Sequence, residues 1–417
     1  MSSSAAAEAG VSRNPLRFKA TRMFLRRLSL KKLLSFNDSS VELGELNVLI
    51  GPNAVGKSNL IEVISLLQAA PTNLAAAILR GGGVRQWLWL GDPVRSPIGT
   101  IECELMLPRA QRFWPCPLTY RLQFSEDAKG FVIMQEQLSR SGPGIRPEAA
   151  EAYFDRSTLG VSLGPQPLDL QQTKSQLTAI PRTASVLSQF KSLADPTPVT
   201  EVGNHFAQIR IYREFKTSPG SPARYGISAA APKDSLMDGA DNLALVLHEL
   251  DFLGEHDRIK DYLGRFCERF EDVKVSVGEG LARTFLREAG LVEMLSAIRM
   301  SDGTLKFLSL LAALFHPDPP SLMCIEEPEV GLHPDALQLV AEALVEASHS
   351  IQLIVTTHSD ALIDALSDRP EAVLVCERDF DNGTQFKRLA KEQLHEWLEH
   401  YTLGQLWRRG EIGGGRW

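Results

Sequence analysis

The clearest chemical signal in the sequence is the octapeptide Gly51-Pro-Asn-Ala-Val-Gly-Lys-Ser58. Two glycines five positions apart, followed by lysine and serine, are typical of a loop that cradles phosphate groups with its backbone N–H groups. In such a loop Lys57 contacts the β- and γ-phosphates, and the Ser58 hydroxyl holds Mg²⁺. The nucleotide-binding residues predicted here are Gly51, Pro52, Asn53, Ala54, Val55, Gly56, Lys57, Ser58 and Asn59.

The residues on either side of this loop predict the elements that must hold it. Residues 46–50 form a short apolar run, which is typical of a buried strand. After Ser58, apolar residues recur at helical spacing up to about Ala69. Strand, glycine loop and helix is the order that such a site needs, because the dipole at a helix N-terminus favours an anion. A chance match in an ordinary loop is the alternative, and the flanking elements disfavour it.

A second group of candidate residues follows the apolar run Ser321–Ile325. Glu326 and Glu327 come directly after it, where a buried parallel strand would deliver acids to its C-terminal end. We expect Glu326 to lie near the metal through water, since Mg²⁺ keeps part of its hydration shell. We expect Glu327 to orient or deprotonate an attacking water. A solvated turn is the alternative for this segment taken alone.

Two further positions complete the candidate site. His358 ends the next apolar run, where it could touch the γ-phosphate or hold the geometry of water and carboxylate, although a lone histidine is more often structural. Ser301, Asp302 and Gly303 precede an apolar helical pattern, so Ser301 can cap a helix whose N-terminus offers a second anion site. One nucleotide needs only one such anion site, so the second site would serve the nucleotide of a partner subunit. A plain helix cap is the alternative.

Composition limits the classes of protein that the chain can belong to. The sequence has 417 residues, 44% of them hydrophobic, which predicts two or three structural units with a substantial core. No apolar run is long enough for a transmembrane helix, and the N-terminus does not read as a signal peptide, so a cytoplasmic protein away from membranes is expected. Five scattered cysteines fit a reducing compartment.

The charge is distributed unevenly along the chain. The net charge is −7, yet residues 1–40 hold eight basic residues against Glu8 and Asp38. Such a cluster can contact the phosphate backbone of DNA. A solvated face or a flexible tail is the slightly favoured interpretation. The basic residues are Arg13, Arg17, Lys19, Arg22, Arg26, Arg27, Lys31 and Lys32.

The pattern along the chain suggests five regions. Residues 1–19 read as a disordered tail, and 20–139 as the lobe that carries the phosphate loop and an antiparallel sheet. Residues 140–204 are rich in proline, glycine, serine and glutamine and read as a variable surface insertion with one or two short helices. Residues 205–290 combine a returning strand, a helical region broken near Leu253-Gly254 and a β segment. Residues 291–417 hold the remaining motifs.

These motifs resemble, in order and in role, those of ABC-type ATPase heads. The resemblance rests on Gly51–Ser58, Ser301–Thr304, Ile325–Glu329, Gly331–Pro334 and Thr357-His358. It is closer to the RecF/SMC/OLD-like branch than to transporters and covers residues 20–138 and 205–417. It implies an α/β fold: a P-loop NTPase head with a mixed central sheet, an antiparallel β subdomain and a helical or irregular insertion.

The resemblance also implies a function. A member of this branch binds and hydrolyses ATP with Mg²⁺ and closes as a homodimer, in which Ser301, Asp302 and Gly303 form the signature motif that acts on the partner's nucleotide. Residues 331–333 would match the D-loop. The biological setting implied is DNA repair or anti-phage defence, with a separate effector protein, possibly a nuclease, and with DNA as a possible partner. A slow ATP-dependent scaffold and, less favoured, a transporter ATPase are the alternatives.

Several details stay open or depart from the pattern. Glu326 stands where the wider class has aspartate, and Asp302 where transporters usually have glycine. The Q-loop glutamine could be Gln123, Gln135 or Gln137. Phe36 could stack on adenine, although a core phenylalanine is commoner. The acids Glu377, Asp379 and Asp381 could suggest a fused nuclease site, but Asn382-Gly383 favours a β-hairpin turn instead.

Overall fold

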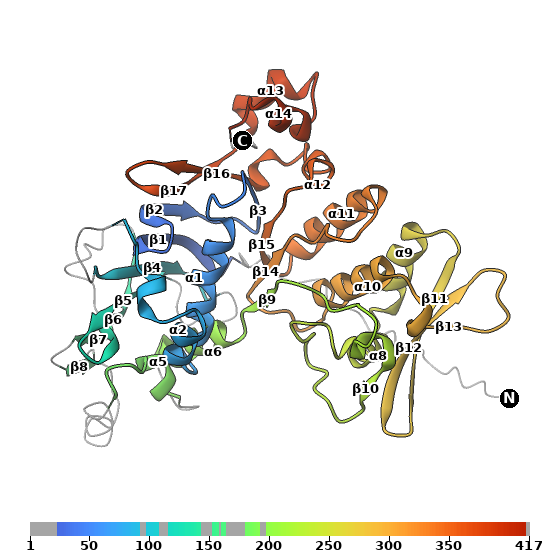
Figure 1. The fold of residues 1–417 in the computed structure, drawn as a ribbon, viewed down its shortest axis with the longest axis horizontal. Helices are drawn as coiled ribbons and strands as arrows, with labels where there is room; N and C mark the ends of the chain where they lie inside the picture. Colours follow the sequence, from blue (N-terminus) through green and yellow to red (C-terminus); the bar gives the residue numbers. More distant parts are fainter. Residues whose placement is uncertain are drawn as a thin grey trace, which may run out of the picture.

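The protein is built around a large mixed sheet with helices on both faces (Figure 1). The structure is a computed structural model and describes residues 23–91, 97–107, 116–142, 152–157, 160–163, 180–191 and 197–413. Over this part of the chain the 13 strands of the sheet run in the order β8-β7-β6-β5-β4-β1-β2-β17-β16-β3-β15-β14-β9. The α/β fold predicted from the motifs is confirmed. The predicted tail, residues 1–19, and Arg22 lie outside the described residues.

Five neighbouring parallel strands form the centre: β9 (Arg210–Tyr212), β14 (Leu322–Glu326), β15 (Gln352–Thr356), β3 (Leu46–Ile50) and β16 (Val373–Asp379). All five residues of β3 are buried, because helices cover both faces of a parallel sheet. Successive side chains of β3 enter opposite cores: Val48 and Ile50 join one hydrophobic cluster and Leu49 the other. A continuous apolar run in the sequence therefore marks a central strand.

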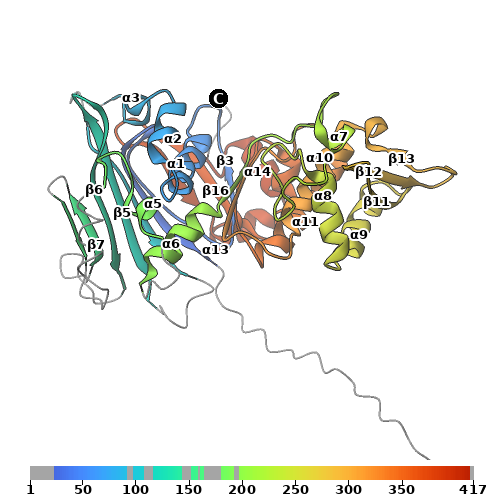
Figure 2. The same cartoon turned by 90° about the horizontal axis from the view of Figure 1, so that it is seen from below.

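The N-terminal half of the sheet is antiparallel and lies around α1 and α2 (Figure 2). The sequence predicted an antiparallel sheet in this part of the chain. Its main strands are β1 (Leu25–Leu33), β2 (Phe36–Glu42), β4 (Gly99–Leu105), β5 (Leu118–Asp127) and β6 (Gly130–Arg140). The helices beside them are α1 (Lys57–Ala69), α2 (Leu74–Arg80) and α3 (Val84–Trp87).

The insertion contains more regular structure than the sequence suggested. Two strands, β7 (Ala152–Ser157) and β8 (Gly160–Leu163), extend the sheet from the edge of β6, and α5 (Val186–Gln189) and α6 (Pro198–Ala207) follow. The two helices match the prediction, but the two strands were missed. Their pairing is set by the open edge of β6, which supplies ladder hydrogen bonds to a segment with little strand signal of its own.

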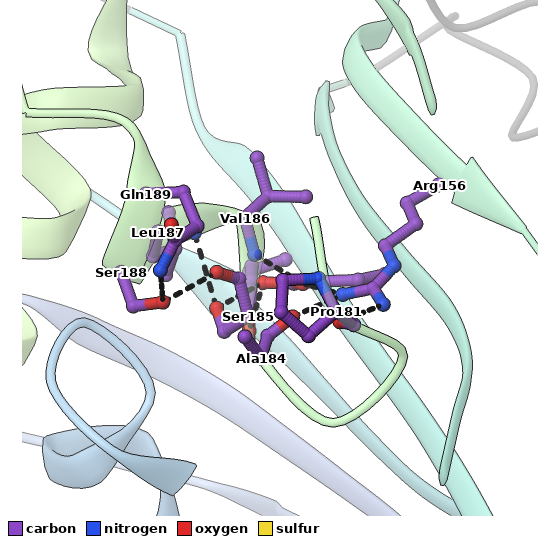
Figure 3. A network of polar contacts seen from close by, with 10 residues as sticks. Arg156, Pro181, Ala184, Ser185, Val186, Leu187, Ser188 and Gln189 are labelled. Carbon is purple, nitrogen blue, oxygen red and sulfur yellow. Dashed lines mark hydrogen bonds and ion pairs between the residues drawn. The ribbon is translucent and has the colours of Figure 1, made fainter. Parts of the chain in front are cut away.

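A buried polar network fastens the insertion to the sheet (Figure 3). Glu136 on β6 is fully buried and accepts hydrogen bonds from Tyr120 Oη (2.9 Å) and Val186 N (2.7 Å), with Ser185 Oγ as a third donor. Arg156 on β7, with one guanidinium nitrogen 3.9 Å from the Glu136 carboxylate, donates to the carbonyls of Pro181 and Ala184. The network therefore joins strands β5, β6 and β7 to the segment that leads into α5.

The helical side of the molecule carries a second, smaller sheet, in which β12 pairs with β10, β11 and β13. The helices of this side are α7 (Pro222–Tyr225), α8 (Leu243–Phe252), α9 (His256–Phe266), α10 (Asp302–Leu314) and α11 (Leu337–Ser348). Its strands are β10 (Ile227–Ser228), β11 (Phe270–Gly278), β12 (Leu281–Glu288) and β13 (Leu295–Ser296). The predicted break falls between α8 and α9, where Gly254 has a φ of 87°.

The C-terminal part returns to the central sheet. The strands β16 and β17 (Gly383–Arg388) form the predicted hairpin, with Asp379 paired opposite Gly383. The helices α12 (Asp360–Asp364), α13 (Lys391–Leu398) and α14 (Leu403–Arg409) pack beyond it (Figure 1). In the described part of the chain no helix is both long and apolar enough to span a membrane.

Candidate functional site

The glycine loop connects β3 to α1, as the pattern predicted. Gly51 and Gly56 both have positive φ, 145° and 112°. A Cβ atom at Gly51 would lie 2.5 Å from the Cys376 carbonyl oxygen, and one at Gly56 would lie 2.3 Å from Thr384 Oγ1. Both positions therefore require glycine for backbone angle and for space. Helix α1 starts at Lys57 with no side-chain cap, so its first N–H groups stay available to an anion.

Lys57 is buried and folds back over its own loop. Its Nζ donates to the carbonyl oxygens of Gly51 (2.7 Å) and Pro52 (2.9 Å). Burial lowers the pKa of this amine, and the negative charges of Glu327 and Glu329 partly oppose that shift. The side chain thus lies inside the loop, with acids from the end of β14 close enough to influence it.

The β16–β17 hairpin supports the glycine loop from the side. Thr384, fully buried on β17, donates to the Val55 carbonyl oxygen and contacts Ser35 Oγ at 2.7 Å. The sequence predicted the hairpin but not this contact, because nothing local indicates which loop a hairpin will touch. Thr384 therefore fixes the backbone just before Gly56.

The first acid after β14 lies beside Ser58. The Ser58 hydroxyl hydrogen-bonds the Glu326 carboxylate, and Arg213 Nη1 lies 3.6 Å from Glu326 Oε1. Burial raises the pKa of Glu326, while Ser58 and Arg213 oppose that shift. Among the described residues, Glu326 Oε1 is buried and has no hydrogen-bond partner. A buried, unsatisfied carboxylate oxygen next to a serine hydroxyl fits the oxygen ligands that Mg²⁺ prefers.

The second acid, Glu327, has an unusual backbone conformation. Its φ is 47°, in the left-handed region that non-glycine residues rarely adopt, and its N–H donates to the Thr356 carbonyl oxygen at 2.9 Å. Its Oε1 lies 3.6 Å from His358 Nε2. The structure therefore brings together the two residues that the sequence assigned to the attacking water.

Glu329 organises the segment that carries His358, a role that the sequence did not reveal. Its Oε1 accepts hydrogen bonds from Thr357 Oγ1 (2.7 Å) and from the backbone N–H of His358 (2.8 Å). Burial raises the pKa of Glu329, which these two hydrogen bonds oppose. The acid thereby ties the end of β14 to the end of β15. The signal in the sequence was its presence two residues after Glu327.

A cavity of about 310 Å³ lies beside the acids. Glu326 and Glu327 line it, together with Arg213 from the end of β9 and Lys306 from α10. Arg213 also contacts Glu62 Oε1 on α1 at 2.5 Å. Sequence reasoning missed Arg213, although it directly follows the returning strand, β9, as Glu327 follows β14.

The predicted signature motif lies at the start of α10. Ser301 is exposed, and its Oγ accepts a hydrogen bond from the Thr304 N–H at 3.0 Å, so it caps the helix. The segment predicted as D-loop packs against this start, since a Cβ at Gly303 would lie 3.1 Å from the Gly331 carbonyl oxygen. Lys306 Nζ donates to the Val330 carbonyl oxygen at 3.1 Å. The two segments therefore form one surface.

The three glutamines considered for the Q-loop do not reach the site. Gln123 on β5 bonds to Thr100 Oγ1 at 3.2 Å, and Gln135 and Gln137 on β6 bond to the Asp155 carboxylate. Strands β5 and β6 lie six and seven strands away from β3 in the sheet. With about 4.8 Å between strands, no side chain bridges that separation. The Q-loop glutamine therefore stays unassigned, because sequence order does not show how far apart strands lie.

Phe36 and the described residues of the basic cluster, Arg26, Arg27, Lys31 and Lys32, belong to the fold itself. Phe36 begins β2, is fully buried, and stacks on Phe386 with ring centroids 5.8 Å apart, so the core alternative holds. Arg26 pairs with Glu104 at 3.0 Å and Lys31 with Asp38 at 3.2 Å. Part of the basic charge near the N-terminus is therefore neutralised within the chain.

Comparisons with known proteins agree with this geometry. Residues 46–96 and 208–364 match a family described as "AAA domain, putative AbiEii toxin, Type IV TA system". The two segments contain every residue predicted for the site. A 77-residue stretch is 38% identical to the Old nuclease of Escherichia phage P2 and spans 18% of this chain but only 13% of that protein.

Solved structures with the same fold are heads of Smc proteins. One is an Smc head bound to the C-terminal winged-helix domain of ScpA, with a TM-score of 0.52 and 12% identity over 89% of this chain and 99% of that one. Another is the Pyrococcus furiosus Smc head with an extended coiled coil, bound to the C-terminal domain of ScpA. It has a TM-score of 0.52 and 13% identity over 90% and 98% of the two chains. The motifs and the family match support an ATPase of the ABC/AAA type, and the likeness to the Smc heads is one of fold.

Proposed function

We propose that the protein hydrolyses ATP with Mg²⁺ and closes as a head-to-tail homodimer around two nucleotides. The observation that carries this proposal is the meeting of Glu327 and His358, 3.6 Å apart, next to the glycine loop that holds Lys57. The left-handed backbone of Glu327 supports a functional role, because such conformations cluster at active sites.

Each residue has a distinct role in this reaction. The backbone N–H groups at residues 51–59 bind the phosphates, and Lys57 exchanges its two loop carbonyls for the β- and γ-phosphate oxygens. Ser58 and Glu326 would hold Mg²⁺, which would supply neutralisation of phosphate charge. Glu327 accepts a proton from the attacking water, and His358 fixes the direction of that carboxylate. Most of the acceleration comes from positioning and charge neutralisation.

The second half of the site comes from the partner subunit. Ser301, Asp302 and Gly303 lie on the surface at the N-terminus of α10, beside the segment 331–333. This exposed position lets the motif reach a nucleotide that another subunit holds. In the closed dimer the motif contacts the γ-phosphate bound to the other subunit, so hydrolysis removes that contact and opens the dimer.

The dimer controls a separate effector protein in DNA repair or anti-phage defence. The partial match to a phage nuclease and the Smc-type fold support this setting by analogy. The nuclease activity itself is not carried over, because the match covers so little of that relative. Turnover measured with and without DNA distinguishes a DNA-associated ATPase, which DNA stimulates, from a scaffold whose slow turnover DNA leaves unchanged.

The central test is the variant Glu327→Gln. It keeps the size of the side chain and most hydrogen bonds but removes the base, so it should bind Mg-ATP, hydrolyse it at least about a hundredfold more slowly, and accumulate a dimer. Size-exclusion chromatography with light scattering, with and without ATP, measures the mass. A Glu327→Gln protein that turns ATP over normally would show that another group activates the water.

A second substitution tests the shared site. Adding Ser301→Arg to Glu327→Gln places a bulky side chain at the interface, so the ATP-dependent dimer should disappear while each monomer still binds ATP. Ser301→Ala in the same background is the control, because it loses the cap, at a cost of about 1 kcal/mol, without adding bulk. If the Ser301→Arg double variant dimerises as well as Glu327→Gln alone, the site is complete within one chain.

A further inference from the structure

The strongest feature outside the residues discussed so far is a buried arginine beside the signature motif. Arg224 lies on the short helix α7, which contacts the 3₁₀ turn Ala297–Arg299 that leads into α10 (Figure 2). Only 8% of its side chain is exposed. A guanidinium buried to this extent must find partners for its donors, since an uncompensated charge in the interior is costly.

The partners of Arg224 are the backbone carbonyls just before the motif. Its Nη1 donates to the carbonyl oxygens of Ala297 (3.1 Å), Ile298 (3.3 Å) and Met300 (2.7 Å). Its Nε donates to the Thr217 carbonyl oxygen at 2.5 Å. The planar guanidinium thus fixes the path of the backbone into Ser301 from outside α10.

Arg224 also neutralises the acid within the motif. Its Nη2 donates to Asp302 Oδ1, the first residue of α10. Asp302 is 57% exposed, so its charge faces the surface that would meet the partner's triphosphate. A carboxylate and a phosphate close together repel each other, and a buried cation behind the carboxylate offsets that repulsion. This pairing explains how the motif tolerates aspartate at this position.

A short segment of chain connects Arg224 to the residues around Glu326 in the same subunit. Eleven residues before Arg224, Arg213 contacts Glu62 and lies 3.6 Å from Glu326. A Cβ at Gly226 would lie 2.6 Å from the Ala282 carbonyl oxygen, so the end of α7 packs tightly against β12. Packing against β12 therefore holds helix α7, and with it the Arg224 guanidinium, in place.

We propose that Arg224 is the positioning residue of the signature motif: it sets the backbone before Ser301 and cancels the charge of Asp302, so that α10 can accept a partner's γ-phosphate. This inference rests on the ATP-dependent dimer proposed above. It assigns Arg224 no contact with nucleotide in its own subunit, and it makes cancellation of the Asp302 charge a condition for closing the dimer.

The test uses the full chain in the Glu327→Gln background with Mg-ATP. Arg224→Gln should weaken the dimer about tenfold by light scattering at several protein concentrations, while the affinity of the monomer for a fluorescent ATP analogue changes by less than about twofold. Arg299→Gln is the matched control, because Arg299 is an exposed arginine on the adjoining turn. It removes the same charge and should dimerise like the parent.

A double variant separates charge compensation from loss of structure. Arg224→Gln with Asp302→Asn should regain at least about threefold of the lost dimer affinity, which collapse of the loop alone would not allow. With Glu327 restored, Arg224→Gln should lower kcat more than it raises KM. Asp302→Asn alone leaves the buried guanidinium and its carbonyl contacts in place. It therefore tests the charge compensation even if Arg224→Gln does not fold. It should dimerise at least as tightly as the parent.

The possible failures are distinct. If Glu327→Gln itself stays monomeric with ATP, the proposed dimer and the role of Arg224 both fall. If it dimerises but Arg224→Gln matches Arg299→Gln, only the inference about Arg224 is overturned. A double variant without recovery, or an Asp302→Asn dimer weaker than the parent, would equally overturn the charge compensation.

Discussion

At the scale of single residues, the site is a set of charges held by burial and by short contacts. Lys57 folds back on the loop carbonyls, Glu326 leaves one buried oxygen unsatisfied, and Glu327 takes a strained backbone conformation. Each of these arrangements costs free energy in the absence of a ligand. Nucleotide and metal would relieve those costs, so binding residues here should matter more for affinity than for stability.

Replacing Lys57 tests this expectation. Lys57→Ala should weaken ATP affinity at least about tenfold, because one charge-assisted hydrogen bond contributes about 1.5–3 kcal/mol. Without nucleotide, its free energy of unfolding should change little, because removal of a buried amine with a lowered pKa and loss of its two contacts with loop carbonyls oppose each other. Isothermal titration calorimetry and urea denaturation measure the two quantities. Lys129→Ala, an exposed turn position, is the control, and normal turnover by Lys57→Ala would refute the assignment of the phosphate loop.

At the scale of elements, the site depends on contacts between strands and loops that are distant in the sequence. Glu329 ties β14 to β15, the β16–β17 hairpin supports the glycine loop, and Arg213 at the end of β9 lies next to Glu326. All of these elements come from the parallel centre of the sheet or its neighbouring hairpin. The carboxyl ends of parallel strands meet at one edge, so polar residues that follow each strand gather there.

The hairpin contact gives a prediction about ATP affinity. Thr384→Val keeps the shape of the side chain but leaves the buried Val55 carbonyl oxygen without its donor, which should cost about 1–3 kcal/mol of stability and weaken ATP binding. Thr384→Ser keeps the hydroxyl and should stay close to the original protein. Thermal unfolding and calorimetric titration compare the two variants, and equal behaviour would mean that the hairpin does not support the loop.

At the scale of the whole molecule, one sheet connects the nucleotide site to the insertion. The insertion is fastened through the network around Glu136, where burial raises the pKa of the carboxyl despite three hydrogen-bond donors and Arg156. A raised pKa in the folded state means that the native protein binds the proton more tightly than the unfolded chain. The contribution of Glu136 to stability is therefore fully present below pH 4.5 and declines as the pH rises through the folded pKa.

Glu136→Gln should remove this pH dependence. The amide cannot ionise, so the stability of the variant relative to the original protein should increase as the pH rises from about 4.5 to 8. Urea denaturation at a series of pH values measures the difference, and Glu126→Gln on the neighbouring strand β5 is the control. A constant difference between variant and original protein across this range would show that Glu136 is ionised throughout.

The sequence by itself determined the parts of this protein that depend on neighbouring residues. The loop from Gly51 to Ser58 needs a strand before it and a helix after it, and Ser301 needs only the next three residues to cap α10. Continuous apolar runs placed the central strands β3, β14 and β15 for the same reason, since a segment buried on both faces must be apolar throughout. Such features are local, so their signal survives without knowledge of the fold.

Only the tertiary structure decided which distant segments meet. The glutamines on β5 and β6 fitted the Q-loop by type and order, yet strand pairing carries them far from β3. The positions of Arg213 and Arg224 near the site depend on the pairing of β9 with β14 and on the packing of α7 beside the turn before Ser301, so the sequence did not reveal them. The strands β7 and β8 likewise formed on an edge that the rest of the sheet created. Pairing between distant segments is set by the packing of the whole chain, because no short stretch of sequence encodes its own partner.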